Sequence, residues 1–354
     1  MSNSDYKFKL RAMQPSDSAS VAKLITEFGD GMTTKFLIDA YTAITFGTEH
    51  QTSGVVVECD GYDGFAGMGT VRYSKVRFNG EILPYAFLDG LKVHKNFRGQ
   101  GLGYQIANWR IQQAKELYGD KCIFATGMLQ DNLASYAVAK KWCREFVEPA
   151  FDALIMPTRK QQPKPIAGII VREINPNEYE EFSAKQNEFY KNYNLYPLSD
   201  ASSIKNALTV AAEGRKPYRY FIAVDSHGNL LAGAKTWTRG ILKSDTINNP
   251  PMPLRILNNI LHVLPSDFTI REVAVDGLWY ESDQIQVARF LWEMIRWECR
   301  EQSTTIVASF DPRDPTRQVV TLKPWHQPRP KITIAIHGHD AINRDKLLFP
   351  TGRV

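Results

Sequence analysis

Residues 91–103 read Leu-Lys-Val-His-Lys-Asn-Phe-Arg-Gly-Gln-Gly-Leu-Gly, and they decide how the whole chain is interpreted. An apolar strand is predicted to end near Val93, and a loop with three glycines follows it. From Leu102 to Tyr118, apolar residues recur with the period of a helix. Glycines let a ligand approach the backbone closely, and a helix N-terminus presents unpaired N–H donors and roughly half a positive charge. The segment therefore predicts a binding site for a phosphate or pyrophosphate group.

The spacing of the glycines indicates which phosphate ligand the loop binds. The dinucleotide fingerprint G-x-G-x-x-G requires glycine where the chain has Tyr104, and the Walker loop requires a G-K-[ST] sequence that is absent here. What remains is Arg98-x-x-Gly101-x-Gly103, which closely resembles the acyl-CoA signature (Q/R)-x-x-G-x-(G/A) of the GNAT superfamily of N-acetyltransferases. The resemblance implies that the pyrophosphate of acetyl-CoA is cradled by Arg98, Gly99, Gln100, Gly101, Leu102 and Gly103.

The resemblance covers nearly the whole first half of the chain. Asp-Gly and Asn-Gly turns separate apolar runs in a way that favours hairpins. The predicted order is strand 8–13, helix 14–28, helix 33–46, strands 55–58, 65–78 and 83–93, helix 102–118, strand 121–125, helix 132–142, and a strand ending at 156. This is the order of a GNAT domain, which implies a mixed α/β fold with a mostly antiparallel central sheet flanked by helices.

The second half repeats the opening pattern of the first. Residues 158–168 are polar, contain prolines and lack periodicity, so they are predicted to link two domains. After them, Ile169–Ile174 followed by Asn175–Glu178 parallels Phe8–Met13 followed by Gln14–Asp17. The chain therefore resembles a protein with two tandem GNAT-like domains.

The glycine-rich loop is not repeated with the rest of the pattern. Where the first half has Val93 to Gly103, the second has Val275–Ser282, with one glycine, no arginine and an additional acidic residue that would repel a pyrophosphate. We expect a GNAT domain with the acyl-CoA loop over residues 1–157, and a degenerate GNAT-like domain without it over residues 169–354. The second domain would brace the first and shape the amine-binding cleft.

Acetyl transfer to an amine needs a base, an oxyanion site and a pathway for protons. Alkylamines have pKa values near ~10, so a base or a water chain must remove a proton before attack, and fixed N–H donors must stabilise the oxyanion. Base candidates are Glu81, Asp89 and His94, with Asp89 first because it lies two residues before Leu91; the alternative for Asp89 is a solvated acid at a strand end. By resemblance, the backbone of Leu91 and Val93 pairs with pantetheine and supplies the oxyanion donor.

The helix after the next strand departs from the family pattern. In the family it reads N-x-x-A-x-x-L-Y-x-K-x-G-F, with the tyrosine as proton donor to the CoA thiolate. Here Asn132 keeps the position of a further pantetheine contact, but the tyrosine position holds Ala139. Tyr136 lies three residues earlier, almost one turn back, and reaches the sulfur only if the helix is shifted. Otherwise solvent or the second domain donates the proton, or the domain binds acyl-CoA without turnover.

Bulk properties limit the remaining function classes. The 43 Lys and Arg residues against 38 Asp and Glu give a net charge of +5, which is too mild and dispersed to predict nucleic-acid binding. No apolar run approaches the roughly 20 residues needed to cross a membrane, and no signal peptide is evident. The four cysteines lack a C-x-x-C pair, which predicts reduced, mostly buried thiols in a cytoplasmic protein. No metal-ligand set is predicted, and the oligomeric state stays open.

These observations lead to one main hypothesis and two alternatives. We expect a cytoplasmic, acetyl-CoA-dependent N-acetyltransferase that acts without a metal and moves an acetyl group to a primary amine of a small molecule or peptide by direct attack. The alternatives are a non-catalytic acyl-CoA-binding sensor or regulatory module, which the loss of tyrosine at Ala139 favours, and a Rossmann-like nucleotide binder. The identity of the amine and the acyl length are not readable from the sequence, because fold does not fix function.

Overall fold

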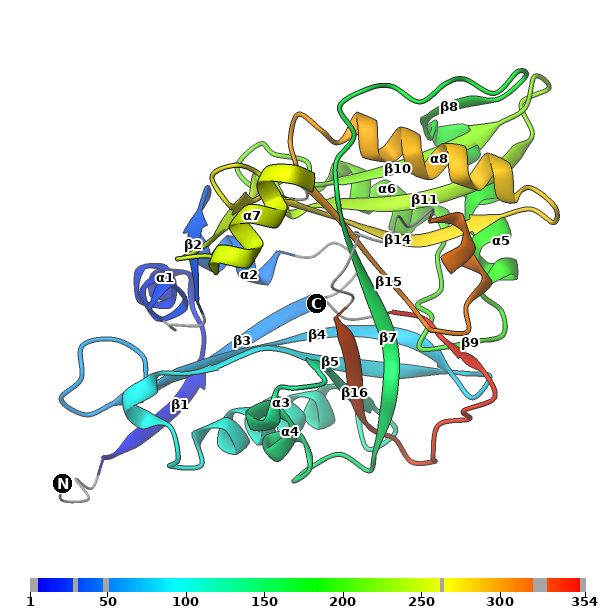
Figure 1. The fold of residues 1–354 in the computed structure, drawn as a ribbon. Coiled ribbons are helices and arrows are strands. Elements are labelled where there is room, and N and C mark those ends of the chain that lie inside the picture. The colour runs from blue at the N-terminus through cyan, green and yellow to red at the C-terminus, as the bar shows by residue number, and fades with distance from the viewer. Residues whose placement is uncertain (1–5, 28–30, 47–50, 262–263, 321–329, 351–354) are drawn as a thin grey trace.

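The computed structural model describes residues 6–27, 31–46, 51–261, 264–320 and 330–350 (Figure 1). The helices are α1 (Ser18–Thr26), α2 (Ala40–Thr45), α3 (Leu102–Tyr118), α4 (Leu133–Ala139), α5 (Tyr179–Phe189), α6 (Ala201–Thr209), α7 (Met252–Leu261) and α8 (Ile285–Glu298). The strands are β1 (Phe8–Ala12), β2 (Met32–Phe36), β3 (Gln51–Cys59), β4 (Gly67–Phe78), β5 (Glu81–Val93), β6 (Ile123–Leu129), β7 (Glu145–Pro157), β8 (Ile170–Glu173), β9 (Tyr193–Asn194), β10 (Tyr218–Val224), β11 (Leu230–Thr238), β12 (Lys243–Ile247), β13 (Thr269–Ile270), β14 (Glu272–Tyr280), β15 (Thr305–Phe310), β16 (Lys331–His337) and β17 (Leu347–Leu348).

One large sheet runs through both halves of the chain. Within the described ranges it has 12 strands in the order β1-β3-β4-β5-β6-β16-β7-β15-β14-β11-β10-β8. Neighbouring strands are antiparallel except for the pairs β5–β6 and β14–β15. In Figure 1, α3 and α4 cover the first-half strands on one side and α8 covers the second-half strands. The predicted mixed α/β fold with a mostly antiparallel sheet and flanking helices is confirmed.

The two halves exchange strands at the centre of this sheet. β7, which ends the first half, pairs with β15 of the second half over residues 152–157. β16 comes from the C-terminal part of the chain and lies between β6 and β7. A second, three-stranded sheet joins β2 to β12 and β13. The division into 1–157, a linker and 169–354 stays a prediction, and this exchange means that neither segment contains all the strands of its part of the sheet.

The predicted helix over 33–46 is wrong in its first half. Residues Met32–Phe36 form strand β2, and only Ala40–Thr45 are helical, with Asp39 accepting a hydrogen bond from the Thr42 amide at 2.9 Å as the N-cap. β-branched Thr33 and Thr34 favour an extended backbone. The pairing of β2 with β12, more than 200 residues later, then decides for the strand.

The β4–β5 hairpin has the turn that its sequence predicts. Asn79 and Gly80 have φ values of +54° and +105°, as a two-residue hairpin turn of the primed type requires. The register places Phe78 opposite Glu81 and continues without a break to Val71 opposite Leu88. The hairpin thereby carries the end of β5 towards the glycine-rich loop.

The sequence pattern that opens both halves of the chain corresponds to the same local structure in each half. In each half, a strand leads into a short 3-10 turn and a helix: β1, residues 15–17 and α1, then β8, residues 176–178 and α5. Both turns have a capping box whose acidic residue also pairs with an arginine on the preceding strand. The pairs are Arg11–Asp17 at 2.7 Å and Arg172–Glu178 at 2.5 Å.

We expect Asp17→Asn to lower the free energy of unfolding at neutral pH by about 1–2 kcal/mol, because it removes a charged cap and ion pair. Hydrogen bonds from Arg11 are the largest cause of the lowered pKa of Asp17. A lowered pKa contributes stability above the ordinary pKa of the carboxyl group, and this contribution is lost as pH falls through the lowered pKa. Urea unfolding at neutral and acidic pH should show the difference shrinking in acid; Asp120→Asn, at a side chain 95% exposed, is the control.

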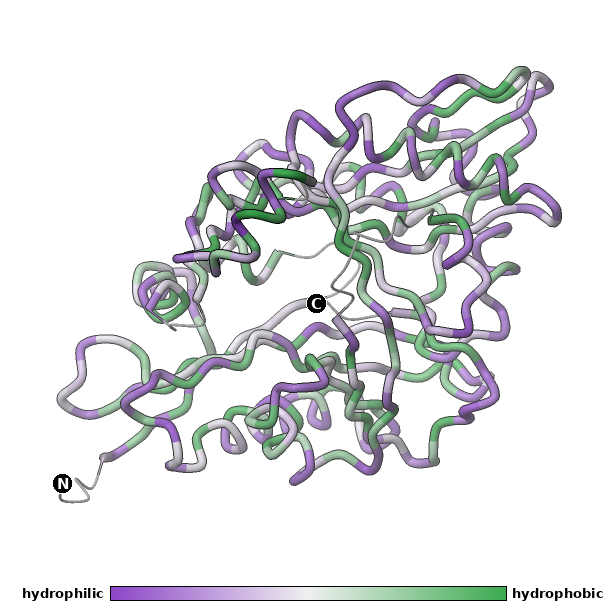
Figure 2. Tube along the Cα trace, in the orientation of Figure 1, coloured by the Kyte–Doolittle hydropathy of each residue, from purple (hydrophilic) through white to green (hydrophobic). Residues whose placement is uncertain are grey.

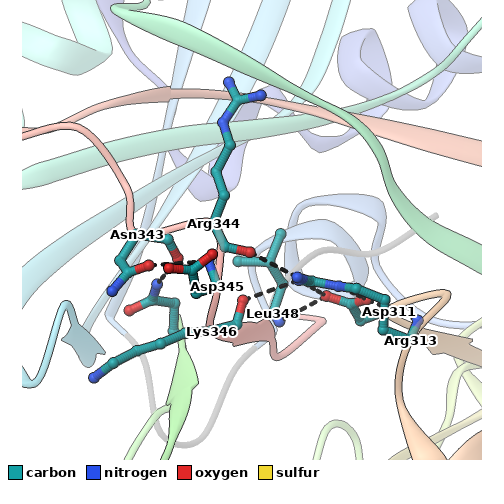
Figure 3. A network of polar contacts seen from close by, with 8 residues as sticks. Asp311, Arg313, Asn343, Arg344, Asp345, Lys346 and Leu348 are labelled. Carbon is teal, nitrogen blue, oxygen red and sulfur yellow. Dashed lines mark hydrogen bonds and ion pairs between the residues drawn. The ribbon is translucent and has the colours of Figure 1, made fainter.

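The C-terminal segment is tied to the loop after β15 by a polar network (Figure 3). Arg313 pairs with Asp311 at 2.8 Å and donates to the carbonyls of Arg344 and Lys346. The amide of Leu348 donates to Asp311 Oδ2, the same oxygen atom that Arg313 Nη2 contacts. These bonds fix the path of the chain that follows β16.

Apolar residues line the strands of both halves, whereas polar residues follow the loops and residues 158–168 (Figure 2). β16 contributes Ile332, Ile334 and Ile336 to the same buried cluster as β5 residues Tyr85 and Phe87. Burial of such side chains stabilises a fold by roughly 1.5–3 kcal/mol each. In the described ranges, no helix combines the length and apolar character needed to cross a membrane.

Candidate acyl-CoA site

A bulge interrupts the β4–β5 ladder near the end of β5, and pairing resumes beyond it. Met68 pairs with Lys92 and Thr70 pairs with Asp89, so Gly69 alone faces the two residues Gly90 and Leu91. An extra residue on one strand is a β-bulge, which interrupts the ladder and bends the strand. Gly90 has a φ of +61°, a left-handed conformation that glycine adopts without strain.

The glycine-rich loop ends at the N-terminus of α3, as predicted. Gly99 and Gly101 have φ values of +81° and +78°, and Gly101 is the N-cap residue of α3. A Cβ atom at either glycine would meet nothing within 4 Å, so the backbone faces open space. The exposed side chain of Arg98 lies against the same turn, with Nε donating to Val93 O at 3.2 Å. The loop therefore presents free space, a helix N-terminus and a cation to an anionic ligand.

Two further residues of the loop anchor it to the protein. Leu102 is buried at 1% exposure in a cluster with Ile106 and Phe97. Gly103 permits close contact between α3 and α4, because a Cβ there would lie 2.9 Å from Val138 Cγ2. Gln100 is exposed at the tip of the loop.

A cavity of about 350 Å³ opens beside the bulge, between α3, α4 and the ends of β5 and β6. Its walls include three of the predicted site residues: Asp89, Leu91 and Asn132. Val93 and the loop residues 98–103 do not line it; they lie farther along the chain, where β5 leads into α3. Asn132 caps α4 through a hydrogen bond from the Ser135 amide at 3.1 Å.

Asp89 lies in this cavity with partial exposure. Its side chain is 24% exposed and its Oδ2 is 3.3 Å from Arg72 Nη2, while Oδ1 accepts from the Gly90 amide at 2.8 Å. The other base candidates lie elsewhere. Glu81 is exposed at the start of β5, and His94 is buried beside an aromatic cluster. The geometry therefore places one carboxylate at the cavity.

Tyr136 lies away from the cavity. Its ring stacks on Phe146, with centroids 4.1 Å apart, whereas Ala139 lines the cavity wall. Desolvation and the nearby Glu148 carboxylate raise the pKa of Tyr136, so the hydroxyl stays protonated at neutral pH. Its role as proton donor stays a prediction, because its side chain is not among those that line the cavity.

Arg110 and Ile332 are among the cavity residues that the sequence analysis did not predict. Arg110 on α3 is only 2% exposed, and its guanidinium donates to the carbonyls of Thr70 and Asp89 at the bulge. Its signal in the sequence is a cation within the apolar stripe of a helix that also contains Ile106 and Ile111. Ile332 lies on β16, about 200 residues from the rest of the site, and no local pattern connects it with the loop.

The second half keeps the bulge but fills the space beside it. Asp276-Gly277-Leu278 repeats Asp89-Gly90-Leu91, and Gly277 has a φ of +60° within a register shift against β11. Gln186 donates to Gly277 O at 3.0 Å and Tyr190 donates to Leu278 O at 2.5 Å. These α5 side chains are buried and occupy the two carbonyl groups of the second-half bulge.

The cysteines nearest the site are poor nucleophiles. Burial raises the pKa of Cys122 to about 12 and also raises the pKa of Cys143. The reactive form of cysteine is the thiolate, which such surroundings suppress. Among the described residues, no three His, Cys, Asp or Glu side chains gather closely enough to hold a metal ion.

A bulged strand that leads through a glycine-rich turn into a helix, beside a cavity, is the arrangement that the resemblance of the loop to GNAT proteins predicts. Residues 26–143 match the sequence profile of the family described as "Acetyltransferase (GNAT) family". This part of the chain is a GNAT domain, and the resemblance drawn from the loop is confirmed. A search of curated protein sequences found no match.

Solved structures with the same fold extend over nearly the whole chain. Saccharomyces cerevisiae N-myristoyltransferase with bound myristoyl-CoA is 8% identical, with a TM-score of 0.64 over 96% of this chain and 86% of that one. A GCN5-related N-acetyltransferase from Sphaerobacter thermophilus is 15% identical, with a TM-score of 0.55 over 94% and 95%. A glucosamine N-acetyltransferase region of a fungal multi-domain β-N-acetylglucosaminidase is 12% identical, with a TM-score of 0.62 over 94% and 38%. At these identities the likeness is one of fold.

Proposed function

We propose that this protein is a cytoplasmic N-acyltransferase that moves an acetyl group from acetyl-CoA to a primary amine by direct attack. The observation that carries the proposal is the cavity with Asp89, Leu91 and Asn132 in its walls, next to the open loop at the N-terminus of α3. A pyrophosphate at the loop would direct pantetheine along β5, which brings the thioester to the bulge. The acceptor is a small-molecule or peptide amine.

Each step of the transfer has a residue suited to it. Asp89 accepts the proton of the incoming ammonium, directly or through water, so that the neutral amine attacks the thioester carbon. A backbone amide at Leu91, where the bulge interrupts the ladder, donates to the oxyanion. The thiolate of CoA then takes a proton from solvent or from a side chain such as Tyr136. The raised thiol pKa values of Cys122 and Cys143 argue against a cysteine acyl intermediate.

A second candidate function is an acyl-CoA-binding sensor without turnover. It is favoured by Ala139 at the tyrosine position of the family and by the stacking of Tyr136 on Phe146 outside the cavity. In this case acetyl-CoA would bind as above, but no group would protonate the leaving thiolate. The two functions differ in turnover and not in binding.

The test combines binding with thiol release. Titration calorimetry should give one acetyl-CoA site per chain, because the second half has no loop and its bulge is filled. The chain is then incubated with acetyl-CoA and a panel of polyamines, amino acids, aminoglycosides and lysine peptides, and free CoA is followed with a thiol reagent. We expect release that depends on the amine and an acetylated product in the mass spectrum. Binding without release from any acyl-CoA tested, acetyl or longer, supports the sensor instead.

A further inference from the structure

Arg110 is a buried cation whose hydrogen bonds are to the backbone. Among the residues that the structure describes, its guanidinium donates only to carbonyl oxygens: Nη1 to Thr70 and to Asp89, both at 2.8 Å, and Nε to Ile106 at 3.2 Å. Burial lowers the pKa of Arg110 to about 10, with the nearby Asp89 carboxylate acting in the opposite sense. The group is therefore charged at neutral pH although almost no solvent reaches it.

The two carbonyls lie on either side of the bulge. Thr70 and Asp89 are the last residues that pair before the ladder is interrupted, so one nitrogen atom of Arg110 bridges β4 and β5 at the edge of the bulge. Gly69 provides the room for this bridge, because a Cβ on it would lie 2.9 Å from Arg110 Cζ. The bulge, the glycine opposite it and the arginine beneath it form one arrangement.

Stability alone does not account for a charge at this place. A buried cation costs free energy even with the Asp89 carboxylate nearby, and apolar residues of similar volume commonly stabilise such positions as well or better. Arg110 also lines the cavity, and it lies on the helix that begins at Gly101 of the acyl-CoA loop. The guanidinium thus connects the loop helix to the strand that carries Asp89.

We propose that Arg110 is a positioning residue that holds the β5 bulge in the geometry that pantetheine and the thioester need. The inference rests on the proposed function, since it assigns a role within the same site. The guanidinium fixes the carbonyl of Asp89, and through it the direction of the Asp89 carboxylate and of the backbone at Leu91. Without the hydrogen bonds from Arg110 to Thr70 and Asp89, the loop proposed for the pyrophosphate would stay intact. The groove along β5 and the cavity, where we propose that pantetheine lies, would lose its shape.

The test compares two ligands in calorimetric titrations. Acetyl-CoA contacts the loop and the groove, whereas 3′-phosphoadenosine 5′-diphosphate has the pyrophosphate but no pantetheine. The variants are Arg110→Met, which removes the donors at similar length, and Arg110→Lys, which keeps the charge but not the planar fork. Gly69→Ala keeps Arg110, but its added methyl group would lie 2.9 Å from Arg110 Cζ and 2.8 Å from Ile106 Cγ2, so both side chains must shift. Gln112→Ala, on the exposed face of α3, is the matched control.

We expect Arg110→Met to weaken acetyl-CoA binding by about tenfold or more, with the affinity for the diphosphate changed by less than about twofold. Arg110→Lys and Gly69→Ala should fall between this variant and the wild type, and Gln112→Ala should bind as the wild type does. Thermal unfolding verifies that each variant is folded; if Arg110→Met does not fold, Gly69→Ala gives the same comparison.

Three results overturn the inference. One is an equal loss of affinity for both ligands, which indicates general damage to α3. Another is unchanged acetyl-CoA affinity in every folded variant. A wild-type protein that binds the diphosphate and acetyl-CoA with equal affinity also contradicts it, because no groove contribution exists to be lost. If the wild-type protein binds neither ligand, the proposed function itself is wrong. This outcome is seen in the wild-type titrations, before any variant is compared, so it is distinguishable from failure of the Arg110 inference alone.

Discussion

Gly101→Glu is expected to abolish acetyl-CoA binding, with a loss of affinity of at least about 100-fold. The substitution places a carboxylate at the N-cap of α3, where the open backbone faces the predicted position of the pyrophosphate. The glutamate repels the ligand and competes with it for the unpaired N–H donors of the helix. Titration calorimetry with acetyl-CoA measures the effect.

The same helix offers a matched control for backbone strain. Gly119 follows the C-terminus of α3, has a φ of +74° compared with +78° for Gly101, and also has no atom within 4 Å of an added Cβ. Gly119→Glu therefore introduces the same residue at another positive-φ position, on the other end of the helix. Gly119 has a ψ of -172° compared with 0° for Gly101, a conformation that costs a side chain still more strain. We expect Gly119→Glu to lose at least as much stability as Gly101→Glu and yet to retain binding. Equal binding by the two variants would falsify the assignment of the pyrophosphate to this loop.

Asp89→Asn is expected to lower kcat by a factor of about 10²–10⁴ at neutral pH, because a general base of this kind contributes that much to proton transfer. The amide still accepts the hydrogen bond that Asp89 receives from the Gly90 backbone, so the local structure should persist. The apparent affinity for acetyl-CoA should change little. Activity should recover partly at high pH, where the amine loses its proton without help.

Steady-state kinetics over a range of pH values, with the amine identified in the thiol-release panel, measure this effect. Glu81→Gln is the control, since it neutralises an exposed carboxylate at the opposite end of β5. Full activity of Asp89→Asn would mean that water or another group removes the proton. A large rise in KM for acetyl-CoA at unchanged kcat would instead assign Asp89 to the shape of the groove.

Local patterns in the sequence determined the elements around the loop. The strand, the three glycines and the helix of period 3.6 lie within about 30 residues, and each depends on contacts inside that stretch. The same holds for the Asn79-Gly80 turn and for the repeated capping boxes at Asp17 and Glu178. The residue preferences of turns and helix caps depend on contacts within three or four residues, so they can be predicted from the sequence alone.

The tertiary structure decided which distant residues meet. Strand β2 exists because β12 pairs with it, and β16 enters the centre of the sheet between β6 and β7. The periodicity of apolar residues indicates whether a segment is a helix or a strand and which face is buried, but it does not indicate which strand pairs with it.

The candidate site also has a part that the sequence predicts and a part that only the tertiary structure shows. The loop that we propose for the pyrophosphate was readable from residues 98–103. Asp89 was chosen for its spacing to Leu91, and Asn132 from the family pattern of the helix that it caps. The bridge from Arg110 to Thr70 and Asp89 and the wall at Ile332 were not, because they join segments separated by 21 to about 200 residues. The sequence by itself determined the loop and the helix after it, and it predicts that they bind a pyrophosphate. Only the folded chain determined the shape of the cavity beside them, since burial and long-range hydrogen bonding arise when the segments pack together.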